Sequence, residues 1–284
     1  MTSTTGRRPA RPSAATAPPV AVALQVKALT AQYERGRPVL VDIDLTVGVG
    51  ESVALIGRNG CGKSTLLHCL SGSITPSAGS IELGPDSLVP LSQLSPRRRA
   101  RRLGILHQSL PPIAGLTVRG LVTQGRYAHR HPLARFGDRE SDEHVERALA
   151  DVELLERADE LLDTLSGGQR QRARLAVVLA QASPILLLDE PTAHLDVRHQ
   201  LLLLDLVSRL RIERGLTVVT VLHDLDQVAR CAERVVALQE GRVVADGPVA
   251  EVITPELLRN VFGVVGRLLP GNPWPPRVLI DAPA

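Results

Sequence analysis

The chain has 284 residues, of which 44% are apolar and 22% charged, a balance typical of a globular protein with a sizeable core. Its 33 basic and 30 acidic residues are interspersed and leave a net charge of only +3, which argues against nucleic acid as a partner. No segment approaches the roughly 20 apolar residues of a membrane-spanning helix, and the three cysteines form neither a zinc-binding spacing nor a disulfide framework.

The N-terminal residues 1–22 are rich in Pro, Ala, Ser and Thr and lack the apolar stretch of a signal peptide, so we expect a disordered tail. From about residue 24, alternating apolar residues predict strands over LQVKALTAQY and VLVDIDLTV, followed by a buried strand at ESVALIG. A glycine-rich turn and a helix beginning near LLHCL come next, and GSIEL and LGILHQ predict two further strands.

From Thr117 to about Leu165 the pattern is helical, with Thr117 and Ser141 as expected N-caps. The order of elements predicts an α/β fold with a mostly parallel sheet covered by helices on both faces, interrupted by an all-helical insert at about 109–165. We therefore expect one domain over residues 23–263, followed by a Pro-rich and loosely held C-terminal extension at 264–284.

Five arginines lie between residues 97 and 102, within the helix-permissive segment PRRRARR. Such a run can contact nucleic acid or anionic lipid, but a solvated helix face is the interpretation we favour.

The segment 57–65 contains the pattern G-x-x-x-x-G-K-[ST], between a predicted strand and a predicted helix. Its glycines allow backbone N–H groups to turn toward phosphate oxygens, and the start of the helix adds a positive end. We expect Lys63 to reach the β and γ phosphates of a nucleotide and the Ser64 hydroxyl to bind Mg²⁺. The nucleotide-binding residues predicted in this loop are Gly57, Asn59, Gly60, Cys61, Gly62, Lys63, Ser64 and Thr65.

The segment PILLLDEP, residues 184–191, predicts a buried central strand that ends in two carboxylates. Ligands of parallel sheets bind beyond the carboxyl ends of the strands, where Asp189 and Glu190 fall. Asp189 is expected to hold Mg²⁺ through water and Glu190 to polarise the attacking water. Successive strand residues point in opposite directions, which would allow the two acids separate roles.

A second candidate anion site lies in LSGGQRQR, residues 165–172. Ser166 is a natural helix N-cap, and Gly167 and Gly168 leave backbone N–H groups open. Because one ATP does not need two separate phosphate sites, the simplest explanation is a dimer in which this segment contacts the nucleotide of the other protomer. Here the sequence resembles the ABC ATPase family, whose defining motif is LSGGQ.

The resemblance covers about residues 24–263 and implies a P-loop NTPase core with an antiparallel β subdomain and an all-helical insert. It also implies ATP and Mg²⁺ as cofactors. Tyr33 matches the aromatic residue that stacks on adenine, and Gln108 matches the Q-loop residue that links the Mg²⁺ site to the insert. Asp196 matches the D-loop, and His223 the switch histidine that contacts the γ-phosphate. The signature residues implied at the nucleotide are Ser166, Gly167, Gly168 and Gln169.

Longer segments, including VVADGPVAEVITPELLRNVFG at 243–263, resemble importer ATPases for ferric siderophores, haem and cobalamin, and most closely the siderophore group. That resemblance implies a peripheral protein at the cytoplasmic face of the membrane. Its partners would be a second copy of itself, two permease subunits and, indirectly, a substrate-binding protein. Haem or cobalamin import, an exporter subunit and an iron–sulfur assembly ATPase stay open as alternatives. The interval between Lys63 and Ser166 has no room for the long insertions of DNA-repair ABC ATPases.

Overall fold

The computed structural model describes residues 21–33, 36–84, 87–108, 115–129, 139–271 and 277–284. Most of the predicted N-terminal tail and the first residues of the predicted insert lie outside these ranges. No helix in the ranges described is both long and apolar enough to cross a membrane.

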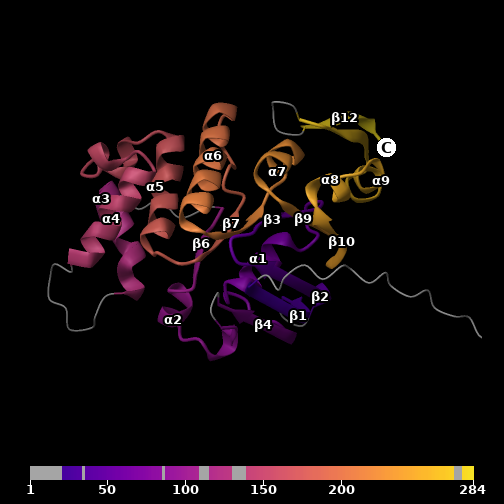
Figure 1. Ribbon diagram of the computed structural model, residues 1–284, viewed down its shortest axis with the longest axis horizontal. Coiled ribbons are helices and arrows are strands. Elements are labelled where there is room, and N and C mark those ends of the chain that lie inside the picture. Colours follow the sequence, from indigo (N-terminus) through magenta and orange to yellow (C-terminus); the bar gives the residue numbers. More distant parts are fainter. Residues whose placement is uncertain (1–20, 34–35, 85–86, 109–114, 130–138, 272–276) are drawn as a thin grey trace, which may run out of the picture.

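Three sheets organise the described residues (Figure 1). The first is antiparallel, in the order β2-β1-β4-β5, with strands β1 (Val22–Gln32), β2 (Pro38–Gly48), β4 (Ala78–Leu83) and β5 (Val89–Pro90). The second has the order β10-β9-β3-β8-β7-β6, with strands β3 (Ser52–Ile56), β6 (Leu103–Leu106), β7 (Ile185–Asp189), β8 (Thr217–Val221), β9 (Arg234–Gln239) and β10 (Arg242–Pro248). The third is a hairpin of β11 (Val264–Leu269) and β12 (Arg277–Pro283).

The α-helices in the described ranges are α1 (Lys63–Leu70), α2 (Pro96–Ala100), α3 (Val118–Thr123), α4 (Arg139–Asp151), α5 (Gly167–Ala180), α6 (Val197–Arg214), α7 (Leu225–Cys231), α8 (Val249–Val252) and α9 (Pro255–Leu257). Short 3₁₀ helices are η1 (Leu91–Gln93), η2 (Gln124–Ala128), η3 (Leu155–Arg157) and η4 (Leu162–Thr164), and η5 (Leu258–Phe262) is a π-helical turn. The predicted P-loop core, antiparallel subdomain and helical insert are all present.

The six-stranded sheet is the centre of the molecule, and its strands β3, β7 and β8 are buried at every position. Strands β9, β3, β8, β7 and β6 are parallel, which explains why β3, β7 and β8 are nearly continuous apolar runs. Val53 and Leu55 pack toward α1 and the antiparallel sheet, whereas Ala54 and Ile56 pack on the opposite side with residues of α6 and α7. This alternation along β3 produces the predicted two-faced layering.

The helical insert packs as one cluster with the core rather than as a separate body. Buried residues of α3, α4 and α5 share a hydrophobic cluster with Leu186 and Leu188 of β7. An ion pair between Arg214 of α6 and Asp151 of α4 joins the two parts at the ends of those helices. In Figure 1 the insert lies at one end of the molecule and the β11–β12 hairpin at the other.

Of the two N-caps predicted within the insert, one is confirmed and one is wrong. Thr117 caps α3, since its side chain accepts a hydrogen bond from the N–H of Gly120. Ser141 is not a cap, because α4 already includes Arg139 and Ser141 lies inside the helix, where it is buried. An ion pair between Arg139 and Glu143 supports this earlier turn.

The arginine run lies largely at the surface, as expected, with Arg97, Arg98 and Arg101 exposed. Arg99, Arg101 and Arg102 donate hydrogen bonds to the backbone carbonyls of Gly72, Ala128 and Leu83, respectively. They therefore tie the α2 region to the end of α1, to η2 and to β4. The guanidinium of Arg97 lies over the ring of Tyr127, 5.5 Å from its centroid.

The C-terminal extension is not loosely held. Leu268 and Val278 pack against the core cluster that contains Val228 of α7. The N–H of Val278 also donates to the Oδ1 atom of Asp226, at 2.5 Å. Strand pairing between β11 and β12 and the contacts with α7 therefore attach the described part of the extension to the core.

Candidate functional site

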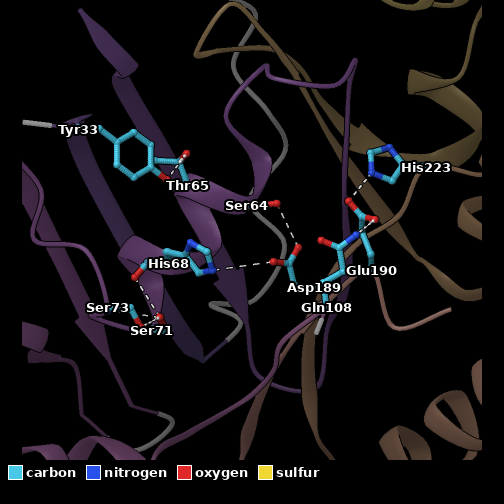
Figure 2. Close-up of polar contacts among 10 residues, drawn as sticks. All are labelled: Tyr33, Ser64, Thr65, His68, Ser71, Ser73, Gln108, Asp189, Glu190 and His223. Carbon is cyan, nitrogen blue, oxygen red and sulfur yellow. Dashed lines mark hydrogen bonds and ion pairs between the residues drawn. The ribbon is translucent and has the colours of Figure 1, made fainter. Parts of the chain in front are cut away.

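The predicted site residues meet at the carboxyl edge of the six-stranded sheet. Strand β3 leads into the glycine-rich loop and α1, β7 ends at Asp189, and the chain reaches His223 just after β8. Because β3, β8 and β7 are adjacent and parallel, their carboxyl ends lie together. Figure 2 shows side chains from these segments directed toward one another.

The glycine-rich loop is shaped by close packing at its first glycine. Gly57 has φ +142°, and a Cβ atom there would lie 2.2 Å from the carbonyl oxygen of Leu238. Buried Lys63 crosses the loop, where its Nζ donates to the carbonyls of Gly57 at 2.7 Å and Arg58 at 3.0 Å. The buried thiol of Cys61 lies 3.9 Å from the same Nζ. The loop therefore has the compact form that a phosphate-binding loop requires.

Asp189 is almost fully buried, at 4% exposure. The Ser64 hydroxyl donates to its Oδ1 atom at 3.2 Å, which joins the start of α1 to the end of β7. Burial raises the pKa of Asp189, while the hydrogen bond from Ser64 and the nearby His68 oppose that rise. The carboxylate and hydroxyl oxygens are ligands of the kind that Mg²⁺ prefers.

Glu190 has a different set of partners from Asp189 (Figure 2). Its Oε2 accepts a hydrogen bond from the amide of Gln108 at 2.7 Å, and its Oε1 contacts Nε2 of His223 at 2.5 Å. Its backbone has φ +46°, an uncommon left-handed conformation for glutamate. The two adjacent carboxylates are thus separated, as the sequence predicts.

An open cavity of about 690 Å³ lies over this edge. Its walls are formed by Tyr33, Val39, Asn59, Gly60, Gly62, Lys63, Ser64, Thr65, Gln108, Glu190 and His223. Nearly all of these residues are predicted site residues, although they come from segments far apart in the sequence. Tyr33 is 53% exposed, and its hydroxyl is 3.1 Å from that of Thr65.

Two histidines beside Asp189 were not predicted as site residues. Nε2 of His68 lies 3.9 Å from Oδ2 of Asp189, and the rings of His68 and His107 have centroids 6.0 Å apart. Burial and then His68 lower the pKa of His107, against the opposing effect of Asp189. The signal for His68 was its position four residues after Ser64, which places both on one face of α1.

The signature segment does not line the cavity. Ser166 caps α5, and Ser166 and Gln169 form a reciprocal capping box. Nδ1 of His199 contacts Oδ2 of Asp196 at 2.7 Å, and a Cβ atom on Gly168 would lie 2.4 Å from the same ring. Gly167, Gly168, Gln169 and Asp196 therefore belong to a second surface, separate from the cavity.

A family model described as ABC transporter matches residues 40–193 of the sequence. The chain belongs to the ABC transporter family. The ferric enterobactin transport ATP-binding protein FepC of Escherichia coli K12 is 44% identical over 223 residues, covering 78% of this chain and 81% of that protein. The predicted ABC ATPase identity is confirmed.

Solved structures of ABC cassettes have the same fold. The inward-facing structure of a putative metal-chelate type ABC transporter has a TM-score of 0.78 and 26% sequence identity, covering 93% of this chain and 98% of that one. The dimeric structure of MJ0796, a bacterial ABC transporter cassette, has a TM-score of 0.69 and 29% identity, covering 80% and 98%. ATP is thus the nucleotide of this ABC ATPase.

We predict that Gly168→Ala destabilises the protein by about 1–3 kcal/mol, the usual cost of overpacking. The new methyl group must displace the ring of His199, which Asp196 holds in place. Gly167→Ala is the matched control, because its Cβ atom would meet nothing within 4 Å. Urea denaturation measures both variants, and equal stability of the two would contradict the proposed crowding.

Proposed function

We propose that this ABC ATPase energises the import of an iron chelate, most specifically a ferric siderophore. The observation that carries the proposal is the 44% identity to the ferric enterobactin transport ATP-binding protein over most of both chains. The likeness to a metal-chelate type transporter supports it. The helical insert must fit the permease with which it assembles. Sequence similarity to a relative that extends over the insert therefore gives indirect information about the type of permease.

The assembly we propose is a dimer of this chain beneath two permease subunits, at the cytoplasmic face of the membrane. A separate substrate-binding protein would deliver the cargo to the permeases. The dimer follows from the separation of the signature surface from the nucleotide cavity. Ser166 and Gly168 of one protomer would contact the nucleotide held by Lys63 of the other.

In each site, Tyr33 would stack on adenine and Lys63 would bind the phosphates. Ser64, Asp189 and Gln108 would hold Mg²⁺ together with phosphate oxygens, because the Ser64 hydroxyl and the Asp189 carboxylate already lie 3.2 Å apart. When bound, Mg²⁺ would neutralise charge on the phosphates. His223 would contact the γ-phosphate, and Asp196 would act at the dimer contact.

Glu190 is the proposed residue that orients the attacking water. Its contacts with Gln108 and His223 fix both carboxylate oxygens at the cavity wall. Asp189 is buried, outside the lining of the cavity, and contacts the Ser64 hydroxyl of the cavity wall, a position suited to metal binding rather than to water activation.

We predict that Glu190→Gln lowers the rate of ATP hydrolysis by about 10²–10⁴-fold while nucleotide affinity changes little, because the amide cannot accept a proton from water. The variant should accumulate as an ATP-bound dimer, measurable by size-exclusion chromatography. Glu156→Gln, at an exposed side chain of η3, is the control. Near wild-type hydrolysis by Glu190→Gln would remove Glu190 from this role.

We predict that Tyr33→Ala weakens ATP binding by about 1–3 kcal/mol, the range for base–aromatic stacking. Tyr33→Phe keeps the ring but loses the hydroxyl contact with Thr65, so it separates stacking from hydrogen bonding. We expect Tyr33→Phe to bind ATP like the wild type in a fluorescence titration. Equal affinity for all three proteins would show that adenine stacks elsewhere.

Deleting the gene should abolish uptake of a radiolabelled ferric siderophore under iron limitation. Wild-type protein should restore uptake and Glu190→Gln should not, because transport requires hydrolysis. Uptake of haem and of cobalamin, measured in the same cells, should not change. Retained siderophore uptake together with loss of haem or cobalamin uptake would overturn the siderophore proposal and leave the ATPase activity standing.

A further inference from the structure

Helix α1 makes two contacts with Asp189, one at each carboxylate oxygen. Ser64 donates to Oδ1 at 3.2 Å, and Nε2 of His68 lies 3.9 Å from Oδ2 (Figure 2). Residues four apart in a helix share a face, so Ser64 and His68 approach the same carboxylate from successive turns of α1. The first contact belongs to the phosphate-loop motif, whereas no motif of the sequence accounts for the second.

The position of His68 is restrained by its surroundings. Its carbonyl accepts hydrogen bonds from the Ser71 hydroxyl at 2.9 Å and from the N–H of Ser73 at 2.9 Å, which hold the last turn of α1. Its ring lies beside that of His107, tilted by 42°, next to the end of β6. The side chain is 31% exposed, so the imidazole borders both the carboxylate and solvent.

A carboxylate held by a single hydrogen bond can still rotate about its terminal torsion, and such rotation would weaken a metal ligand. The terminal torsion of an aspartate side chain is broad, so a single hydrogen bond at Oδ1 does not fix the plane of the group. A second polar group at Oδ2 restricts that rotation. The distance of 3.9 Å is longer than a hydrogen bond, and a small rotation of the ring would bring the two atoms within hydrogen-bonding range.

We propose that His68 is a positioning residue that restrains Oδ2 of Asp189, so that Oδ1 stays directed toward Ser64 and the Mg²⁺ site. This inference rests on the metal-binding role proposed above for Asp189. Groups that orient metal ligands commonly change metal affinity when they are removed, even though they do not touch the metal. His68 therefore affects the binding of Mg²⁺ rather than the binding of the nucleotide itself.

The test is a titration of Mg²⁺ in the presence of a fluorescent ATP analogue, with binding in EDTA as the reference. In His68→Leu, the Mg²⁺ concentration at half-maximal effect should rise about tenfold, the lower end of the range for such partners. Binding in EDTA should stay at the wild-type level. His68→Gln, whose side-chain N–H can reach Asp189, should restore most of the Mg²⁺ response.

Three further variants keep the test decisive. His68→Asn is polar but too short to reach Oδ2, so it should behave like His68→Leu and replaces it if the leucine variant does not fold. Ser73→Ala alters the same end of α1 without contacting Asp189, so it should leave the Mg²⁺ titration unchanged. In an Asp189→Asn background, His68→Leu should add no further shift, because the two residues act through one group.

A wild-type Mg²⁺ response in both His68→Leu and His68→Asn would overturn the proposal. Equal weakening of nucleotide binding in EDTA would also overturn it, since that would indicate general damage to the loop. The single variant Asp189→Asn tests the metal-binding role of Asp189 separately from the positioning role of His68. If that variant shifts the Mg²⁺ response and His68→Leu does not, only the role of His68 fails, whereas an unshifted Asp189→Asn removes the metal role of Asp189.

Discussion

The nucleotide site depends on the parallel pairing of three neighbouring strands. Val221 of β8 pairs with Leu55 of β3 on one side and with Asp189 of β7 on the other. This register brings the phosphate loop after β3, the carboxylates at the end of β7 and His223 after β8 to one edge of the sheet. The buried, apolar inner strands hold the register, because a shift would move apolar side chains out of both flanking cores.

At that edge the backbone gives the two adjacent acids different surroundings. The left-handed conformation of Glu190 costs about 1–3 kcal/mol, which the rest of the structure must supply. Its N–H donates to the carbonyl of Val221, and its carboxylate contacts Gln108 and His223, so three separate interactions stabilise it. Asp189 can therefore remain buried beside α1 while Glu190 faces the cavity. The uncommon conformation of Glu190 thus accompanies different surroundings for the two carboxylates.

The second surface, which carries the signature segment, is built around His199. Its ring lies between Asp196, which it contacts through Nδ1, and Gly168, which has no room for a side chain. A displacement of Asp196 in the D-loop would therefore move the His199 ring and change its contact with Gly168 in the first turn of α5. Because the cavity lies elsewhere in the same chain, the dimer proposed above would use a two-fold axis to bring this surface of each protomer to the cavity of the other.

The sequence alone determined the features that depend on short stretches of chain. The phosphate loop at residues 57–65, the apolar strand before Asp189 and the Ser166 cap are set by local backbone chemistry, and all three are present as predicted. Resemblance to the ABC family added Tyr33, Gln108 and His223 to the predicted site residues, and the fold places these three around one cavity. Only the tertiary structure decided the contact of His68 with Asp189, the pairing of His199 with Gly168 and the attachment of the C-terminal hairpin to α7. These contacts join residues distant in sequence, and the packing of whole helices and strands sets their geometry, which no local pattern encodes.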